Sequence, residues 1–492
     1  MSAESTDVVI IGGGIVGSAI ARELSRYQLA VILLEAETDV AMGTSKANSA
    51  ILHAGFDAKP GTWKGKLNVR GNHLYHQLWQ DLSLDVDWMG SLVVAKDDAE
   101  QATIEELLAR GNQNGVPNLE ILSADQLLER EPNLATDVTG ALWAPSAGVV
   151  CPFGAVFGFI ENAIRNGVTL LRECPVQGIV IDNGRVVGVV TPHGVIRARF
   201  IINAAGIQAD AVARMAGDNS FTIHPRKGEY ILFDKTVRQL VNTVIFPTPS
   251  KVSKGILVSP TVHGNLFIGP DAEDVADKDD VSTTAAGMER VINGARRIVP
   301  QLPLAAAITE FSGLRAASGD GDFILRESET AKGLIHAAGI QSPGFTAAPA
   351  IAEVIADILR EAGLALIEKA EFNPVNPPRR VFREMSWQER AEIVARDPLF
   401  GRVICRCETV TEGEIVATIH SPCGAVTVDG VKRRTRAGTG RCQGGFCGPR
   451  VTAIISRELG IPVTAVRKDG IHSFLFSDKL PGVCEVSTDE QP

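Results

Sequence analysis

The chain has 492 residues, of which 45% are apolar and 22% are charged. Because a single core usually stops growing at roughly 250–300 residues, we expect three structural units, and the composition excludes wholesale disorder. The 58 acidic residues outnumber the 48 Lys and Arg, and the resulting net charge of −10 repels nucleic acid and acidic membrane surfaces.

The amino terminus predicts a strand and a turn, and not a secretion signal. Residues 1–7 carry acid where a signal peptide needs a basic flank, and glycines interrupt the apolar stretch that follows. No apolar run approaches the roughly 20 residues of a membrane-spanning helix. We therefore expect no transmembrane segment and a cytoplasmic protein, with peripheral association at the inner membrane left open.

Residues 7–35 predict a β-α-β unit. Strands are expected at residues 8–11 and 31–34, with a glycine turn at residues 12–17 and a helix at residues 19–26 between them. Two strands joined by a helix in this way begin a parallel sheet.

The glycine turn carries the pattern G-x-G-x-x-G, formed by Gly12, Gly14 and Gly17. The first glycine makes the turn, the second lets backbone approach a pyrophosphate, and the third allows close packing of the helix. Glu35 ends the following strand, where its carboxylate can accept hydrogen bonds from ribose hydroxyls. A glycine-rich turn without a ligand is the alternative, but strand, helix and acid in these places favour a dinucleotide site.

A β-meander is predicted in the middle of the chain, with strands near residues 176–181, 186–190 and 200–202. Segments near residues 86–140 and 221–310 alternate strand and helix patterns without glycine motifs. We expect these two segments to form a substrate domain inserted into the nucleotide-binding fold.

Two further stretches of small residues favour FAD over NAD. Residues 199–206 predict a buried strand that ends at Gly206, where backbone can approach the nucleotide a second time. Residues 333–339 repeat this pattern up to Gly339 and lead into a helix, whose amino terminus can stabilise negative charge on a reduced flavin. The residues expected to contact FAD at this entry into the helix are Ser342, Gly344, Phe345 and Thr346.

A proline-rich stretch follows the helix expected at residues 347–361. Pro374, Pro377 and Pro378 cannot continue a helix, and they stiffen the chain. We therefore place a domain linker at residues 366–400.

Five of the eight cysteines crowd into one region near the carboxyl end, which indicates metal ligation in a reducing compartment. Cys405-x-Cys407 and Cys442-x-x-x-x-Cys447 form two close pairs, and four thiolates suffice for one [2Fe–2S] cluster. Structural zinc is the alternative, but zinc modules favour C-x₂₋₄-C pairs in both halves, and a flavin in the same chain favours iron–sulfur. Cys423 has no partner and is expected to be a buried apolar residue.

Basic side chains near the second cysteine pair would offset the anionic charge of such a cluster. They are Lys432, Arg433, Arg434, Arg436 and Arg441. A nucleic-acid patch is the alternative, but a net acidic chain lacks the broad basic face that such binding needs.

The order of these motifs resembles the D-amino-acid-oxidase-type FAD-dependent oxidoreductases, which include glycerol-3-phosphate and L-2-hydroxyglutarate dehydrogenases. The shared motifs are Gly12 to Gly17, Glu35, Thr44-Ser45, Asn203 to Gly206, Gly313 to Arg315 and Gly339 to Thr346. Residues 50–61 and 226–230 most resemble the hydroxyglutarate branch. The resemblance implies that Thr44, Ser45 and Val176 join the FAD contacts and that His53 and Arg315 lie near the flavin ring.

The carboxyl-terminal cysteine region resembles a bacterioferritin-associated-ferredoxin-like [2Fe–2S] domain. Its matching residues are 404–408 and 440–447, and a similar module belongs to the large subunit of anaerobic glycerol-3-phosphate dehydrogenase. That resemblance implies a partner, a second flavoprotein, that accepts electrons and passes them towards quinone.

Oxidation of a secondary alcohol by hydride transfer to flavin needs a base for the hydroxyl proton and cations that hold an anionic substrate. His53 and Arg315 are our candidates. A covalent flavin tether and a structural histidine are the alternatives for His53, whereas Arg315 lies among small residues that suit close approach of a ligand. Residues that could complete an anion clamp are Lys227, Tyr230, Lys251 and Lys254.

The sequence predicts a dehydrogenase with FAD and a [2Fe–2S] cluster that oxidises a small anionic hydroxy compound. Glycerol 3-phosphate is our first choice of substrate because its branch carries the cysteine module. An arginine-tyrosine pair typical of that branch is absent, since Phe56 and Asp57 follow Gly55. An L-2-hydroxyglutarate or amino-acid dehydrogenase or oxidase is therefore the main alternative, and a non-catalytic electron-transfer subunit is another.

The predicted fold class is α/β, with a Rossmann-like FAD-binding domain, an α+β substrate domain and a small carboxyl-terminal iron–sulfur domain. The expected bounds are 1–85, 141–220 and 311–365 for the FAD-binding domain, 86–140 and 221–310 for the substrate domain, 366–400 for the linker, 401–465 for the [2Fe–2S] domain and 466–492 for a tail.

Overall fold

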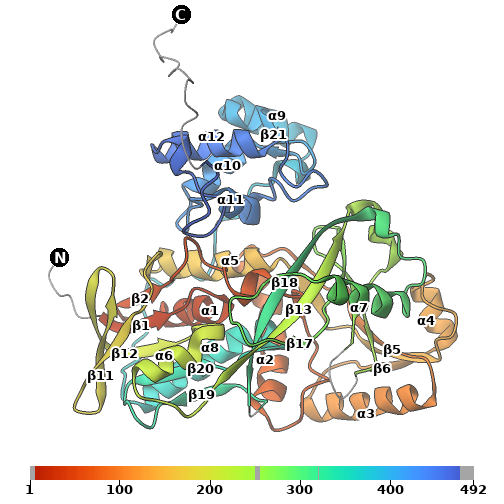
Figure 1. Cartoon of the computed structure of the whole chain (residues 1–492), viewed down its shortest axis with the longest axis horizontal. Helices are drawn as coiled ribbons and strands as arrows, with labels where there is room; N and C mark the ends of the chain where they lie inside the picture. Colours follow the sequence, from red (N-terminus) through yellow and green to blue (C-terminus); the bar gives the residue numbers. More distant parts are fainter. Residues whose placement is uncertain (1–5, 250–254, 320, 477–492) are drawn as a thin grey trace, which may run out of the picture. The chain divides into compact units, whose positions relative to one another are not determined.

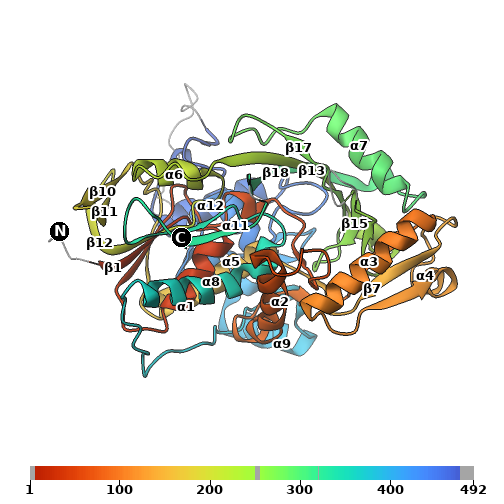
Figure 2. The same ribbon diagram turned by 90° about the horizontal axis from the view of Figure 1, so that it is seen from below.

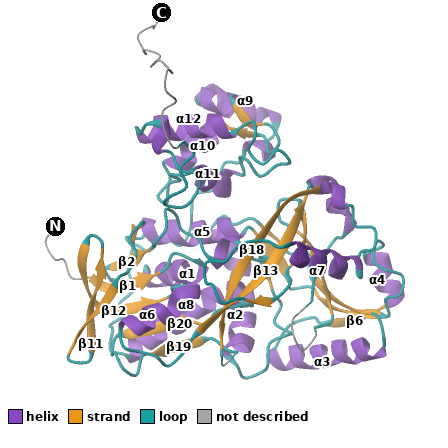
Figure 3. Cartoon of the chain, viewed as in Figure 1, coloured by secondary structure: helices purple, strands orange, loops and turns teal. Residues whose placement is uncertain are grey.

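The computed structural model describes residues 6–249, 255–319 and 321–476. The described residues divide into two compact units, the first ending at Arg379 and the second beginning at Arg380. Figure 1 follows both units along the chain, and Figure 3 shows that each combines helices and strands. The predicted α/β fold class is confirmed. The FAD-binding part and the substrate part, which we expected as separate domains, both belong to the first unit.

The nucleotide-binding sheet of the first unit has the strand order β19–β20–β12–β1–β2–β9. All neighbours in this order pair in parallel except β19 and β20, and the hairpin β10–β11 extends the amino-terminal half of β12. The strands are β1 (Thr6–Ile11), β2 (Val31–Leu34), β9 (Thr169–Leu171), β10 (Gly178–Asp182), β11 (Arg185–Thr191), β12 (Gly194–Asn203), β19 (Ile324–Glu327) and β20 (Leu334–Ala338). The strands expected at both ends of the β-α-β unit and the meander are therefore confirmed.

Helices α1 and α8 run beside one another along this sheet (Figure 2). Helix α1 begins at Ile15, four residues earlier than the sequence predicted, because the turn is already complete at Gly14 and Gly17 lies inside the first helical turn. Helix α8 begins at Gly344, three residues earlier than expected. The helices around the sheet are α1 (Ile15–Leu24), α2 (Trp63–Asp81), α5 (Pro152–Arg165), α6 (Ala209–Met215) and α8 (Gly344–Glu361).

A second, nine-stranded sheet has the order β17–β13–β16–β15–β14–β5–β7–β6, with β18 on the other edge of β13. Figure 3 shows β13 and β18 as its two long strands. The strands are β5 (Ser91–Ala95), β6 (Glu120–Ser123), β7 (Gly140–Ala144), β13 (Ile223–Phe233), β14 (Val244–Pro247), β15 (Leu257–Pro260), β16 (Leu266–Gly269), β17 (Glu273–Asp274) and β18 (Ala307–Ser318). Helices α3 (Asp98–Asn114), α4 (Ala124–Arg130) and α7 (Ala285–Arg296) belong to the same part, and its core buries Phe233, Ile245 and Leu266 completely.

A small three-stranded sheet has the order β3–β8–β4. It consists of β3 (Ile51–Leu52), β4 (Val86–Asp87) and β8 (Gly148–Val150). This sheet presents His53 immediately after β3 and Cys151 immediately after β8.

The segment expected as a linker divides between the two units. Its first part is fastened to the first unit, since Gln28 donates to the Ile367 carbonyl at 2.8 Å and the Asn376 side chain donates to the Gly158 carbonyl at 2.8 Å. Asn376 is buried there and also accepts a hydrogen bond from Asn162. Gly158 lies within α5, so the Asn376 side chain fastens this stretch to the flank of that helix.

The second unit contains the cysteine region and more of the chain than the sequence indicated. Residues 387–396 form helix α9, whose start carries a capping box between Ser386 and Glu389. The other elements are β21 (Val403–Cys405), β22 (Val410–Thr411), α10 (Glu412–Ile419), α11 (Val428–Thr435) and α12 (Gly448–Leu459). Part of the expected tail also belongs here, because Val466 is fully buried and Arg467 pairs with Thr427. Residues 477–492 of that tail lie outside the described residues.

Candidate active site

The glycine turn leaves no room for a side chain where β1 meets β12. Gly12 has a φ of +108°, and a Cβ there would lie 2.5 Å from the Ala204 carbonyl oxygen. A Cβ on Gly17 would lie 1.9 Å from the Gly12 carbonyl oxygen. Only glycine allows the turn, the end of β12 and the first turn of α1 to approach so closely.

Glu35 is held at the end of β2 by backbone donors. Its two carboxylate oxygens accept from Gly13 N at 2.8 Å and from Glu37 N at 2.9 Å. Burial raises the pKa of the Glu35 carboxyl, while these backbone hydrogen bonds oppose the rise. The side chain is therefore fixed beside the glycine turn, where a ribose would lie in a dinucleotide complex.

One cavity of about 1130 Å³ joins the amino end of α1, the end of β2 and the amino end of α8. Its volume exceeds the roughly 300–1,000 Å³ of an ordinary small-molecule site, as a dinucleotide together with a substrate requires. The residues proposed from the sequence that line it are Gly12, Gly14, Glu35, Thr44, Ser45, His53, Val176, Gly206, Arg315, Ser342, Gly344 and Phe345.

Three further residues expected to contact the cofactor are not among those that line this cavity. Gly17 packs against the glycine turn, and Gly339 has a φ of +65° with Ser318 close behind it. The Thr346 hydroxyl donates to the Ile51 carbonyl at 3.1 Å and accepts from His53 N at 2.9 Å. Thr346 therefore supports the chain that carries His53.

Thr44 and Ser45 tie the cavity wall to distant elements. The Ser45 hydroxyl accepts from Ile15 N at 2.9 Å, so it satisfies a backbone donor in the first turn of α1. The Thr44 hydroxyl donates to the Leu314 carbonyl at 2.6 Å, one residue before Arg315 on β18. Both hydroxyls therefore fix the relative positions of walls that come from separate parts of the chain.

His53 lies on the cavity wall next to the start of α8. Its Nε2 is 3.4 Å from the Ser342 hydroxyl, and its ring centroid is 6.0 Å from that of Phe246 with a tilt of 35°. A neutral imidazole in this place can accept a proton from a substrate hydroxyl, and the Ser342 hydroxyl lies within reach to orient it.

Arg315 lies on β18, and its side chain passes Gly228 on the paired strand β13 to reach the cavity. Its Nη2 donates to the Asp271 carbonyl at 3.2 Å, and a Cβ on Gly228 would lie 2.8 Å from the same nitrogen. The guanidinium carries further donors that can bind an anion, and a guanidinium matches phosphate and carboxylate geometry.

The structure describes two of the four residues suggested for the anion clamp. Tyr230 lines the cavity, and its hydroxyl lies 3.4 Å from that of Ser49, a lining residue that sequence reasoning missed. Lys227 is buried and pairs with Asp280 at 2.9 Å, and this hydrogen-bonded ion pair raises the pKa of Lys227. Lys251 and Lys254 lie outside the described residues. No local pattern marks Ser49, because its partner Tyr230 is distant in sequence.

In the second unit, the four cysteines proposed as ligands converge. Cys407 Sγ and Cys442 Sγ lie 3.8 Å apart, and Cys405 and Cys447 share a hydrogen bond. The Cys447 hydrogen bond, together with backbone donors from Gly438 and Glu408, lowers the pKa of the Cys405 thiol.

The other two cysteines differ: burial raises the pKa of the Cys407 thiol, whereas the pKa of Cys442 is lowered. Backbone N–H groups of Phe446 and Gly444 lower the pKa of the Cys442 thiol. Thiolate is the form that binds iron, and backbone donors favour it at Cys405 and Cys442. A set of four converging cysteine sulfurs fits a [2Fe–2S] cluster.

Several basic residues near these cysteines have structural partners. Arg436 and Arg383 both pair with the buried Glu408 at 2.9 Å. Arg434 donates to the Cys423 carbonyl at 2.7 Å, and Cys423 is buried as expected. These contacts hold the loops around the cysteines in place.

Comparison with known proteins agrees with this geometry. Residues 7–358 match the family described as FAD dependent oxidoreductase, and residues 403–457 match the BFD-like [2Fe-2S] binding domain. The chain therefore belongs to the FAD-dependent oxidoreductase family, and its cofactors are FAD and a [2Fe–2S] cluster.

Two similar proteins indicate which FAD-dependent oxidoreductases this chain resembles. The chain is 48% identical to the glycerol 3-phosphate dehydrogenase of Caloramator mitchellensis over 96% of this chain and 98% of that protein. It is 30% identical to the glycerol 3-phosphate oxidase of Mycoplasma genitalium over 75% of this chain and 98% of that protein. The chain is an FAD-dependent dehydrogenase similar to these glycerol-3-phosphate enzymes.

A solved structure shares the fold of the first unit. The dithionite-reduced L-α-glycerophosphate oxidase from Mycoplasma pneumoniae with FAD bound matches with a TM-score of 0.71 and 29% identity, over 76% of this chain and 98% of that one. Among the described residues, no helix is both long and apolar enough to cross a membrane.

Proposed function

We propose that the protein oxidises glycerol 3-phosphate to its 2-keto product by hydride transfer to FAD. The single observation that carries this proposal is that His53 and Arg315 line the same cavity as the glycine turn and Glu35. A base and an anion-binding cation thus share one space with the cofactor-binding residues. The named activities of the relatives support the choice of substrate.

Bound FAD would supply the acceptor for the hydride of the carbinol carbon. Removal of this hydride leaves a hydroxyl proton to be taken up, and we assign that role to His53. The Ser342 hydroxyl, 3.4 Å from His53 Nε2, orients the imidazole. Thr346 holds the His53 backbone, so the ring is positioned from two sides.

Arg315 binds the anionic end of the substrate in this proposal. Its contact with the Asp271 carbonyl fixes the guanidinium, and its remaining donors can hold a phosphate oxygen. The paired hydroxyls of Ser49 and Tyr230 supply neutral polar groups in the same cavity. Tyr230 is itself fixed by stacking on Phe311, with ring centroids 4.7 Å apart.

The second unit gives the protein a route to a one-electron acceptor. Its four cysteines fit a cluster that takes electrons singly, whereas the flavin receives them as a pair. We propose that electrons leave through this unit to a partner, a second flavoprotein that passes them towards quinone. Such a partner is compatible with a cytoplasmic protein that associates peripherally with the inner membrane.

Anaerobic bleaching of the flavin tests the choice of substrate. We expect glycerol 3-phosphate to reduce the flavin, and L-2-hydroxyglutarate, sarcosine and proline to leave it oxidised over the same time. Bleaching by L-2-hydroxyglutarate alone would transfer the proposal to 2-hydroxy acids. Bleaching by dithionite but by none of the four compounds would favour a non-catalytic electron-transfer subunit.

A further inference from the structure

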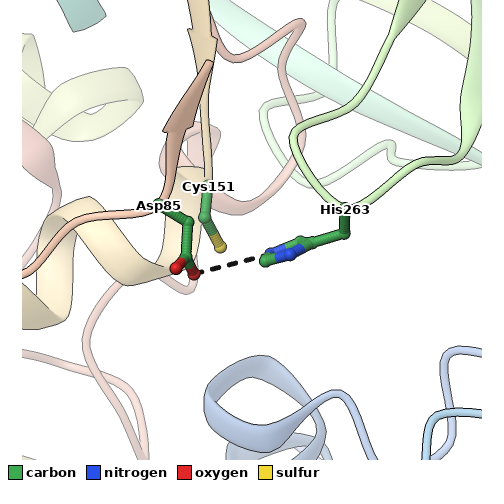
Figure 4. Close-up of side chains that lie close together, drawn as sticks. All are labelled: Asp85, Cys151 and His263. Atoms are coloured by element: carbon green, nitrogen blue, oxygen red, sulfur yellow. Dashed lines mark ion pairs between the residues drawn. The ribbon is translucent and has the colours of Figure 1, made fainter. Parts of the chain in front are cut away.

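Three metal-ligating side chains meet in the first unit away from the cavity. Asp85 lies in the loop before β4, Cys151 precedes α5, and His263 lies in the turn between β15 and β16; none of them lines the cavity. A carboxylate oxygen, a thiol sulfur and a ring nitrogen from the three residues lie within 4.8 Å of one another. Figure 4 shows the side chains pointing towards a common point, with His263 Nε2 3.8 Å from Asp85 Oδ2.

The backbone brings the first two side chains together before any metal binds. Strands β4 and β8 are antiparallel neighbours with Val86 opposite Val150, and Cys151 N donates to the Asp85 carbonyl at 2.9 Å. Asp85 and Cys151 therefore start from adjacent points of one small sheet.

The third side chain is held by a tight turn. Gly264 N donates to the Thr261 carbonyl at 3.0 Å, and Asn265 N donates to the Thr261 hydroxyl at 3.1 Å. The Asn265 side chain anchors the turn to the Phe233 carbonyl at 2.9 Å. A preorganised set of this kind loses little conformational entropy when a ligand joins it.

Each of the two anionic side chains has a hydrogen-bond donor beside it. Cys151 caps helix α5, and its sulfur accepts from Gly154 N at 3.4 Å, which stabilises a thiolate at the helix amino end. Arg379 donates to Asp85 Oδ2 at 3.0 Å, as outer partners of ligating carboxylates do. A carboxylate has two oxygens, so this bond is compatible with metal binding.

The donor set selects the kind of metal. Thiolate and imidazole are ligands of zinc and similar borderline cations, whereas magnesium and calcium prefer oxygen ligands throughout. Cys151 is 5% exposed, and the side chains of His263 and Asp85 are 10% and 29% exposed, so water can reach the carboxylate side. Three protein ligands and one water complete a tetrahedral zinc site.

We propose that Asp85, Cys151 and His263 bind one zinc-class divalent cation. Binding releases the thiol proton of Cys151 to solvent and breaks no other covalent bond. Because His263 belongs to the turn between two strands of the nine-stranded sheet, while Asp85 and Cys151 flank the small sheet, the cation fastens these two sheets together.

Metal counting on the anaerobically prepared holoenzyme tests the proposal. The protein is dialysed against zinc chloride, freed of loosely bound metal, and analysed for zinc, iron and FAD. We expect about one zinc and about two irons per flavin in the wild type, and a melting midpoint that rises with added zinc. His263→Ala should bind zinc about 100-fold more weakly or worse, since even loss of an outer partner costs about 10- to 100-fold, and should keep its iron.

Two conservative variants distinguish the loss of a zinc ligand from misfolding of the protein. Cys151→Ser keeps a helix cap that accepts from Gly154 N, and Asp85→Asn keeps an oxygen for the Arg379 bond. Both should retain FAD and iron but lose tight zinc binding and the zinc-dependent rise in melting midpoint. His193→Ala, in an exposed hairpin turn, is the matched control and should bind zinc as the wild type does. Equal zinc in the wild type and His263→Ala, or zinc that appears only where iron is lost, would overturn the proposal.

Discussion

Arg315 reaches the cavity because a glycine stands beside its guanidinium on the paired strand. Gly228 leaves the space that Arg315 Nη2 occupies, and the Asp271 carbonyl then holds that nitrogen. Gly228 is therefore the residue of the motif 226–230 that the position of Arg315 requires to be small. The motif itself did not reveal that Lys227 turns away and pairs with Asp280.

Removing the Arg315 side chain should lower kcat/KM. The loss of one charge-assisted contact to the substrate anion costs about 2–4 kcal/mol, or about 30- to 1,000-fold. Arg226→Ala is the matched control, since Arg226 is opposite Arg315 in the strand register but pairs with Asp274 at 2.7 Å outside the cavity. Equal kcat/KM for Arg315→Ala and the wild type would exclude the assigned role.

His53→Asn should lower kcat by about 10²- to 10⁴-fold, because the hydroxyl proton loses its acceptor. FAD content should stay at the wild-type level, and acid precipitation of the wild type should release free FAD. Flavin that remains with the precipitated wild-type protein would indicate a covalent tether instead. Unchanged turnover in His53→Asn would leave His53 with a structural role.

At the scale of elements, β12 and β20 share a buried polar network. His336 on β20 lies with its Nε2 3.1 Å from Asp218 Oδ2 and its Nδ1 3.3 Å from the Asn203 side chain at the end of β12. Burial lowers the pKa of His336, although Asp218 opposes this shift. Burial also opposes ionisation of Asp218, but hydrogen bonds from Ser220, Ser328 and His336 outweigh it and lower the pKa of this carboxyl.

This network predicts loss of stability in mild acid. As the pH falls below about 6.5, the unfolded chain protonates His336 while the folded protein holds it neutral, so the free energy of unfolding decreases. The lowered pKa of Asp218 extends the loss below the ordinary value of 3.8. The melting midpoint should therefore change little above pH 7 and fall between pH 6.5 and 5.

A variant separates this histidine from other acid-sensitive groups. His336→Asn should reduce the slope of the melting midpoint against pH between pH 6.5 and 5, whatever its midpoint at pH 7. His193→Ala, which changes an exposed histidine, should keep the wild-type slope. Identical slopes in all three proteins would contradict the assignment to His336.

In the second unit, replacing one cysteine of the proposed ligand set should remove the cluster without unfolding the protein. Cys407→Ser replaces an exposed cysteine of the proposed ligand set and leaves the buried Cys405 and Cys447 in the core. The variant should fold, keep its FAD and lose the broad visible absorption and the iron of the cluster. Full iron content in Cys407→Ser would remove this residue from the ligand set.

Local sequence patterns indicated those parts of the candidate site that consist of residues close together in the chain. The glycine turn, Glu35 and the two cysteine pairs are read from short spacings because one turn or one strand end positions each of them. The bonds from Thr44 to Leu314 and from Thr346 to His53 join residues 270 and 293 positions apart. Such contacts depend on how the sheets pack, so a single sequence does not indicate them.

At the scale of the whole molecule, the proline-rich stretch was the least predictable. Its composition indicated a spacer, yet Asn376 and Ile367 bind it to the first unit and residues 387–396 continue as a helix of the second. Amino-acid composition alone does not show whether a proline-rich stretch forms hydrogen bonds with the domain that it passes. Residues of this stretch up to Arg379 belong to the first unit, and those from Arg380 on belong to the second.

We propose that the protein is a flavin dehydrogenase whose electrons leave through the cysteine unit. If the reduced flavin passed its electrons directly to oxygen, the cluster would have no role in electron transfer. We therefore expect oxygen to be a poor acceptor. Cys442 is the variant of choice because its side chain lies at the surface side of the site, 3.8 Å from Cys407. Cys442→Ser should disable the cluster without altering the cavity of the first unit.

The most direct test measures glycerol-3-phosphate-dependent dye reduction and oxygen consumption in the wild type and in Cys442→Ser. The proposed electron route predicts fast reduction of a one-electron dye by the wild type, slow oxygen consumption, and a large loss of dye reduction in Cys442→Ser with anaerobic flavin bleaching intact. Fast oxygen consumption that is the same in both proteins would contradict it and leave the cysteine unit with a structural role.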